Sequence, residues 1–227
     1  MKRRLIQLLC LLVMVYTGRE IIQYFGAYSQ VNEEIEQVQT LVQEQSLNTL
    51  QQQYEDVVGW ISIEGMKVDY PILQTDNNEF YLRHNYKGTE SRAGSIFLDY
   101  RNDANLTDRH SIIYGHVLRN GSMFGQLANY AEVEFAQRHQ FIEIELAGKK
   151  INLQVFAAYE TTTDFYYIET DFTDTSFADF IDTIQDKSQI DLQVNVTEQD
   201  QLITLSTCTT SVSDAERFVV HAKVIEG

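Results

Sequence analysis

The chain has 227 residues, of which 44% are hydrophobic, and carries a formal net charge of −16 at neutral pH. This length suits one globular domain with an appended segment. The acidic balance argues against a nucleic-acid-binding protein, because such proteins present a basic footprint to phosphate groups. The single proline, Pro71, excludes a proline-rich linker.

The N-terminus combines a cationic start, residues 2–4, with a nearly unbroken apolar run at residues 5–18. This charge bias predicts that the basic end stays in the cytoplasm and that the remainder is exported. The run is shorter than the roughly 20 residues that span a bilayer, and it has the length of the apolar region of a cleaved signal peptide. Because no small-x-small cleavage site follows it, we favour a single retained membrane anchor at residues 1–28. The domain after it is then extracellular, at the cell membrane.

Residues 31–58 are rich in Gln and Glu and contain no glycine. Apolar side chains recur there near helical spacing, at Val31, Ile35, Val38, Leu41, Val42, Leu47, Leu50, Tyr54, Val57 and Val58. The pattern predicts an N-terminal helical region over residues 29–56, with one or two amphipathic helices. Because the apolar stripe continues to Trp60, we favour helices that dock onto the following domain over a solvated spacer.

Short strand patterns replace the helical pattern in residues 57–227. Strand candidates lie at residues 60–65, 67–75, 94–100, 110–117, 141–148, 150–161, 190–196, 201–208 and 217–226. The letters "AGKK" predict a hairpin between residues 141–146 and 151–159. Many short strands with little helix between them indicate a mainly β domain, an antiparallel or mixed barrel rather than a doubly wound sheet.

One helix interrupts the strands. Its apolar residues fall at helical spacing, at Phe177, Phe180, Ile181 and Ile184, after cap candidates at residues 174–176. The helix lies in a long connection, from about residue 161 to 190, that precedes the cysteine strand. Long connections of this kind often build binding sites.

The chain contains two cysteines, Cys10 in the N-terminal run and Cys208. An internal disulfide framework and a zinc site of ordinary spacing are therefore not expected. Cys208 ends the segment "LITLSTC" on the strand face that becomes polar toward Ser206, whereas Ile203 and Leu205 lie on the other, mostly apolar face. This position favours a nucleophile over a packed structural thiol.

An arginine and a histidine are candidates for its partners. If the last two strands form a hairpin, Arg217 lies opposite Cys208, with Cβ atoms about 5 Å apart. An arginine there lowers the pKa of a thiol from about 8.5 and donates to an oxyanion. His116 ends the strand "SIIYGH" at a loop, where catalytic groups are commonly displayed, and we favour it over His221. The remaining histidines, His84, His110 and His139, are expected at the surface or at strand edges.

These residues resemble a known family. "TLSTC" resembles the TLxTC motif of sortases, with "YGH" upstream and an arginine on the following strand. "GSIFLDYRN", the N-terminal helical region and the inserted helix resemble class B sortases, over residues 57–225. The resemblance implies an eight-stranded sortase-type β-barrel, residues 57–227, with N-terminal helices and one helix inserted before the cysteine strand.

The resemblance also implies a membrane-anchored cysteine transpeptidase of Gram-positive bacteria. Such enzymes cleave a C-terminal sorting signal of a surface protein after its threonine, through a thioester. They join the acyl group to an amine of a cell-wall precursor or to a pilin lysine. Cys208 is then the nucleophile, His116 the general acid and base, and Arg217 the group that stabilises the oxyanion. No metal or other cofactor is implied.

Further residues correspond to the peptide groove of class B sortases. Ser206 and Thr207 lie beside the nucleophile, Asn78 and Leu82 resemble groove-lining positions, and Tyr167 and Ile168 resemble a wall contributed by the long connection. Some relatives carry an acidic residue after the cysteine, where this chain has Thr209. Two alternatives stay open: a hydrolytic cysteine peptidase, and a surface scaffold with an incidental thiol.

Overall fold

The computed structural model describes residues 46–162, 164–208 and 216–225, together with residues 3, 4, 7, 10, 11, 13–19, 32–37, 39 and 40. Of Cys208 it describes the backbone. The chain divides into two compact units, residues 1–40 and 41–227. The finer domain boundaries, after residues 28 and 56, stay predictions.

The predicted N-terminal membrane anchor requires a correction. Among the described residues, no helix is both long enough and apolar enough to cross a membrane. The prediction of a single anchor at residues 1–28 is therefore wrong, and the location and membrane contact inferred from it lose their support.

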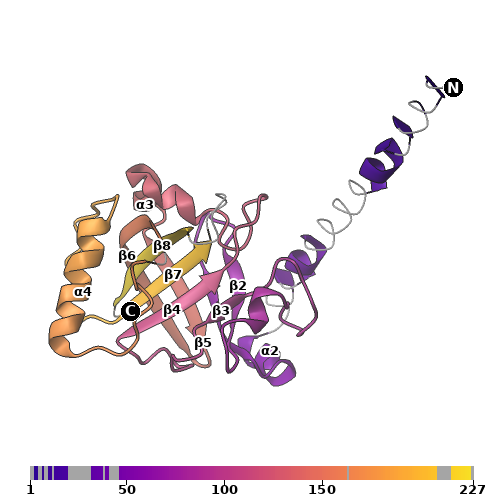
Figure 1. Ribbon diagram of the computed structural model, residues 1–227. Helices are drawn as coiled ribbons and strands as arrows, with labels where there is room; N and C mark the ends of the chain where they lie inside the picture. Colours follow the sequence, from indigo (N-terminus) through magenta and orange to yellow (C-terminus); the bar gives the residue numbers. More distant parts are fainter. Residues whose placement is uncertain are drawn as a thin grey trace. The chain divides into compact units, whose positions relative to one another are not determined.

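Eight strands close into a barrel in the order β1-β2-β3-β4-β7-β8-β6-β5 (Figure 1). Their bounds are β1 Val57–Ser62, β2 Asp69–Leu73, β3 Ile96–Leu98, β4 His110–Gly115, β5 Phe141–Leu146, β6 Lys149–Thr162, β7 Leu202–Cys208 and β8 Glu216–Ile225. The pairs β2/β3 and β4/β7 are parallel, and the other neighbours are antiparallel. The predicted eight-stranded, mainly β barrel is confirmed.

The hairpin between β5 and β6 illustrates how the sequence forms this sheet. Buried and more exposed side chains alternate along Phe141–Leu146, as expected for a strand with one face on the core. The two residues that join the strands end in Gly148, whose φ of +77° lies in the left-handed region that glycine adopts without strain. The hairpin predicted from "AGKK" is therefore present.

Short helices complete the domain: α2 Leu47–Gln53, η1 Phe80–Leu82, η2 Leu127–Ala131 and α3 Val133–Arg138. In α2, Leu47 and Leu50 are buried, so the expected docking of this part of the helical region is observed. The helical positions predicted at Val31, Val38, Leu41 and Val42 lie outside the described residues.

The predicted inserted helix is α4, Asp174–Lys187. It begins at Thr173, whose hydroxyl accepts a hydrogen bond from the backbone N–H of Ser176, while the Ser176 hydroxyl accepts one from the backbone N–H of Thr173. Its predicted apolar residues are all buried in a cluster with residues of β6, β7 and β8. Figure 1 shows α4 along the outside of the barrel, beside β6.

One predicted strand is absent. Residues 190–196, all described, form no strand. Gln193 adopts a φ of +55°, which interrupts an extended backbone, and Val194 and Val196 pack against the cluster beneath α4. Because β7 already pairs with β4 and β8 in a closed barrel, no strand edge is available for a ninth strand.

Candidate active site

Three neighbouring strands end or begin at one rim of the barrel. Cys208 is the last residue of β7 and pairs with Arg217 of the antiparallel strand β8. On the other side of β7, Thr207 pairs with Gly115 of the parallel strand β4. His116 follows Gly115 directly, so its backbone leaves β4 beside that of Cys208. Because neighbouring strands lie about 4.8 Å apart, the backbones of Cys208, His116 and Arg217 converge.

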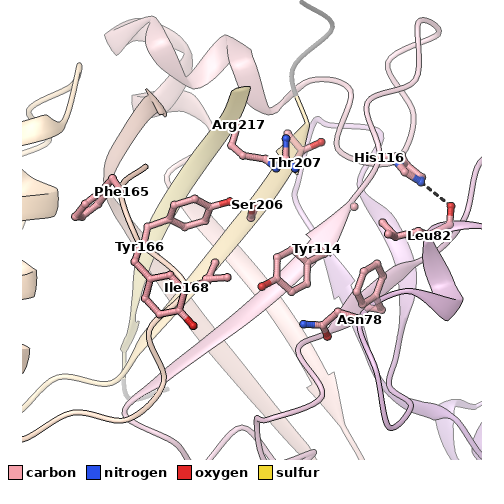
Figure 2. A pocket seen from close by; sticks show the side chains of 13 residues that line it. Asn78, Leu82, Tyr114, His116, Phe165, Tyr166, Ile168, Ser206, Thr207 and Arg217 are labelled. Atoms are coloured by element: carbon pink, nitrogen blue, oxygen red, sulfur yellow. Dashed lines mark hydrogen bonds between the residues drawn. The ribbon is translucent and has the colours of Figure 1, made fainter. Parts of the chain in front are cut away.

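A pocket of about 300 Å³ opens at this rim. Its lining includes every predicted site residue whose side chain is described, as listed here: Asn78, Leu82, His116, Tyr167, Ile168, Ser206, Thr207 and Arg217. Figure 2 shows His116 and Leu82 on one side, Tyr166 and Ile168 on the other, and Ser206 and Thr207 between them. The sequence-predicted residues therefore lie together, and their catalytic and binding roles stay predictions.

The imidazole of His116 is held by a backbone group. Its Nε2 lies 2.7 Å from the carbonyl oxygen of Leu82 (Figure 2). A carbonyl only accepts, so Nε2 carries the hydrogen, and in the neutral ring Nδ1 is the nitrogen that accepts a proton. This bond joins a group at the end of β4 to the η1 segment that lines the pocket.

Gly94 makes that contact possible. It has a φ of +57°, and a Cβ added to it would lie 2.9 Å from both the Leu82 carbonyl oxygen and His116 Cδ2. The same atom would lie 2.6 Å from the backbone oxygen of Tyr81. Any side chain at position 94 would therefore push against both partners of the hydrogen bond.

Arg217 is half-buried at the opposite end of this rim. Its Nη1 donates to the backbone oxygen of the adjacent Glu216, at 2.8 Å. Figure 2 shows the side chain extending toward Thr207 at the end of β7. A guanidinium in this position provides donors for an oxyanion that forms near the strand end.

Two predicted groove residues bind each other. The hydroxyl oxygens of Tyr167 and Ser206 lie 2.8 Å apart, and both side chains are buried. The bond fixes the connection between β6 and α4 against β7, two residues before Cys208. Ser206 therefore has a structural contact in addition to any contact with a peptide.

A buried carboxylate underlies another part of the lining. The side chain of Asp99 is completely buried and pairs with Arg101 at 2.8 Å. Its Oδ2 also accepts hydrogen bonds from Asn78 Nδ2 and from the Tyr114 hydroxyl, each at 2.9 Å. Burial alone would raise the pKa of Asp99, but the hydrogen bonds from Arg101 outweigh it and hold this pKa below its usual value. Asp99 is therefore a charged acceptor at neutral pH.

Comparisons with known proteins agree with this geometry. The family model described as the sortase domain matches residues 61–225. Sortase B of Listeria monocytogenes is 43% identical over 181 residues, covering 79% of this chain and 74% of that protein. Sortase B of Staphylococcus aureus is 35% identical, covering 100% of this chain and 98% of that protein. The chain belongs to the class B sortases.

Solved structures of class B sortases share the fold. A Staphylococcus aureus sortase B–substrate complex is 36% identical and gives a TM-score of 0.76, covering 92% of this chain and 99% of that chain. Sortases are cysteine transpeptidases, so the chain is an enzyme of this type. Within the part of this sortase that the structure describes, no cluster of His, Cys, Asp and Glu side chains is arranged to hold a metal ion.

The lining of this sortase also contains residues that sequence analysis missed. They are the aromatic side chains of Phe97, Tyr114, Phe165 and Tyr166, with Gly115. Tyr114 lies two positions before His116, so period-two alternation could have identified it. Phe165 and Tyr166 precede the predicted pair Tyr167 and Ile168 in a single aromatic run. Phe97 gave no such signal, because it reads as an ordinary core residue of β3.

Two histidines of this sortase are buried, which corrects the expectation for His110. His110, expected at the surface or an edge, and His221 are both completely buried. Nδ1 of His110 lies 2.6 Å from the Glu169 carbonyl oxygen, and Nε2 lies 2.6 Å from the Thr204 hydroxyl. That hydroxyl lies 2.7 Å from Nδ1 of His221, whose Nε2 lies 2.9 Å from the Tyr159 hydroxyl. Both nitrogens of His221 therefore have internal partners.

The hydrogens in this row have one consistent arrangement. The Glu169 carbonyl only accepts, so His110 donates from Nδ1 and, when neutral, accepts at Nε2 from Thr204. Thr204 then accepts from Nδ1 of His221, which accepts at Nε2 from Tyr159. Burial lowers the pKa of His110 to about 4 and the pKa of His221 well below its usual value, so both rings are neutral at pH 7. The row therefore gives every ring nitrogen of both buried histidines an internal partner.

Proposed function

We propose that this sortase cleaves the C-terminal sorting signal of a surface protein after its threonine and transfers the acyl group to an amine of a cell-wall precursor. The observation that carries the proposal is the convergence of Cys208, His116 and Arg217 at the ends of three adjacent strands, beside a largely apolar pocket. The similar Staphylococcus aureus structure is a complex of a sortase B with a substrate, which supports a peptide ligand for this pocket.

The first half of the reaction forms a thioester. Sγ of Cys208, as the thiolate, attacks the carbonyl carbon of the threonine, and Arg217 donates hydrogen bonds to the resulting oxyanion. When the tetrahedral intermediate collapses, the C–N bond breaks. His116 delivers a proton to the leaving amine. The new C–S bond holds the acyl group on the enzyme.

The second half transfers that group. The amine of the cell-wall precursor attacks the thioester carbonyl carbon, and His116 accepts the proton that the amine loses. The C–S bond breaks, the amide forms and the Cys208 thiolate is restored. A sorting peptide that fills the pocket screens the thioester from water, so that the amine competes successfully.

The groove supplies apolar and polar contacts to the peptide. Leu82 and Ile168, together with the aromatic lining, suit apolar side chains, and Thr207, Ser206 and Tyr167 border the position of the scissile bond. Asn78 donates one N–H to Asp99, and its oxygen accepts from the backbone N–H of Tyr100 at 3.0 Å. These bonds fix the orientation of the amide and leave its second N–H to donate to a peptide carbonyl.

The test uses the purified full chain, a panel of threonine-containing sorting peptides and triglycine as the amine, with mass spectrometry of the products. We expect a peptide–triglycine conjugate from the wild type and none from Cys208→Ala, with far-UV circular dichroism as the control for folding. Release of the free acid alone would indicate a hydrolytic peptidase. Transfer to a lysine side-chain amine in preference to triglycine would indicate a pilin-type acceptor.

A further inference from the structure

We propose that Arg101, oriented by the buried Asp99, is a positioning residue that sets the two walls of the peptide groove at a fixed separation. One wall is the wall segment, residues 165–169 of the connection between β6 and α4. The opposite wall contains Asn78 and Tyr114. The peptide as ligand of this groove rests on the proposed function, whereas the positioning of the walls does not.

Arg101 contacts the wall segment at two points. Its Nη2 donates to the Ile168 carbonyl oxygen at 2.8 Å, and its Nη1 donates to the Tyr166 hydroxyl at 3.0 Å. Tyr166 and Ile168 both line the pocket. One planar guanidinium therefore fixes both a backbone group and a side chain of this wall.

Asp99 sets the direction of that guanidinium. Its Oδ1 accepts from the backbone N–H of Arg101 at 3.0 Å and from Nε at 2.8 Å, and its Oδ2 accepts from Nη2 at 2.8 Å. A bidentate pair of this kind restricts the guanidinium to one plane and one orientation. The side chain of Arg101 is 25% exposed, so the pair is shielded from most of the screening that weakens surface ion pairs.

The same carboxylate holds the opposite wall. Asp99 Oδ2 accepts from Asn78 Nδ2 and from the Tyr114 hydroxyl. Figure 2 shows Asn78 and Tyr114 on one side of the pocket and Tyr166 and Ile168 on the other. The Asp99–Arg101 pair thus joins the two walls through a short, rigid link, and the length of this link sets their separation.

A lysine cannot reproduce this link. A lysine ammonium is a compact charge on a flexible stem, so it can pair with Asp99 but cannot hold the fork geometry toward Ile168 and Tyr166 at once. Arg101→Lys therefore keeps the positive charge that Asp99 needs and releases the wall segment. The Tyr167–Ser206 bond remains, so the segment should loosen rather than detach.

The experiment compares wild type, Arg101→Lys and a matched control, Arg138→Lys, which changes an exposed arginine at the end of α3. Hydrogen–deuterium exchange read by mass spectrometry follows peptides that cover residues 164–171. We expect at least about tenfold faster exchange there in Arg101→Lys, with unchanged exchange in β4, β7 and β8. The control should match wild type throughout. Unchanged exchange of the wall segment in Arg101→Lys would overturn the proposal.

Kinetics with a sorting peptide and triglycine provide the second readout. We expect Arg101→Lys to raise KM at least about tenfold with kcat changed less than about twofold, because the groove is altered and the reacting groups are not. The rate of Cys208 alkylation by iodoacetamide should equal that of wild type. A lower kcat with unchanged KM would overturn the proposal. If the wild type transfers no peptide, the proposed function fails, and the exchange measurement alone decides the role of Arg101.

Discussion

The imidazole of His116 and the backbone carbonyl of Leu82 form a 2.7 Å hydrogen bond that joins the end of β4 to the η1 segment of the pocket lining. A backbone acceptor cannot be removed by mutation, but the space around the bond can be changed.

Gly94→Ala should displace both partners of this bond. The added Cβ would lie 2.9 Å from each of them, closer than ordinary contacts allow. Misplacing a catalytic group by about 1 Å costs up to about a hundredfold in rate, so we expect kcat for a sorting peptide to fall between about tenfold and a hundredfold.

The matched control for this change is Gly88→Ala. Gly88 also has a positive φ, +70°, but an added Cβ there meets no atom within 4 Å. Gly88→Ala should lose about 1 kcal/mol of unfolding free energy from the left-handed backbone. Gly94→Ala should lose more, because its Cβ would also lie 2.6 Å from the backbone oxygen of Tyr81. Urea denaturation measures both losses. Equal kcat values for the two variants would show that the contact with His116 is unimportant.

His116→Ala and Arg217→Ala should each lower kcat/KM at least about a hundredfold, the scale found for acid–base and oxyanion groups. Steady-state assays with a sorting peptide and triglycine measure the effect. His139→Ala and Arg138→Ala remove the same side-chain types at positions outside the pocket lining and should retain nearly full activity. Normal turnover by Arg217→Ala would refute its role at the oxyanion.

The bond between Ser206 and Tyr167 should contribute to stability as a pair. Ser206→Ala leaves the buried Tyr167 hydroxyl without this partner, and we expect a loss of about 1–3 kcal/mol in unfolding free energy. Tyr167→Phe removes the other hydroxyl and leaves that of Ser206 without this partner. In the double variant the losses should be less than additive by about 1 kcal/mol in a urea-denaturation cycle. Strictly additive losses would mean that the hydrogen bond between the two hydroxyls does not contribute to the free energy of unfolding.

The two buried histidines, His110 and His221, should make the free energy of unfolding depend on pH. The folded-state pKa of His110 is about 4, below its usual value of 6.5, so the unfolded chain binds more protons between these values. The contribution of the two neutral rings, His110 and His221, to the free energy of unfolding is therefore complete above pH 6.5 and is lost as the pH falls toward 4. For His110 alone the loss at pH 5 is about 2 kcal/mol. The lowered pKa of Asp99 acts at more acidic pH, below about 4, and does not contribute in this window.

Urea denaturation at pH 7, 6 and 5 measures this effect. His221→Gln removes one titrating ring while keeping a donor and an acceptor, so it should flatten the slope even if it lowers stability at pH 7. Equal stability of the wild type at pH 7 and pH 5 would contradict the assignment of two neutral, buried imidazoles.

The strand-end site is predictable from sequence because strand alternation and hairpin pairing are local rules. Cys208 opposite Arg217, and His116 after β4, follow from period-two patterns and from the position of loops. The pairing of β4 with β7 is different, because it joins segments far apart in sequence. The strand-end, loop-mouth position favoured His116 as the partner of Cys208, and the resemblance to sortases implied the same pair.

Other features depend on tertiary packing that periodicity does not encode. Residues 190–196 alternate like a strand, yet they pack against the cluster beneath α4, because the closed barrel leaves no edge to pair with. His110 has a polar side chain and was expected at the surface or at a strand edge. Inside the protein, however, its two ring nitrogens form hydrogen bonds with the Glu169 carbonyl and the Thr204 hydroxyl. The link from Asp99 through Arg101 to Ile168 ends on a backbone oxygen, which has no signature in the sequence.

The parallel pairing of β4 with β7 has a consequence for how the protein acquires activity. His110 and Thr204, neighbours across these strands, are separated by 94 positions in the chain. Contacts between such distant segments form late, after the entropy of closing a long loop has been overcome. A ribosome must therefore synthesise the chain beyond Cys208 before imidazole and sulfur can meet. Truncated or partly folded products should be chemically inert rather than weakly active.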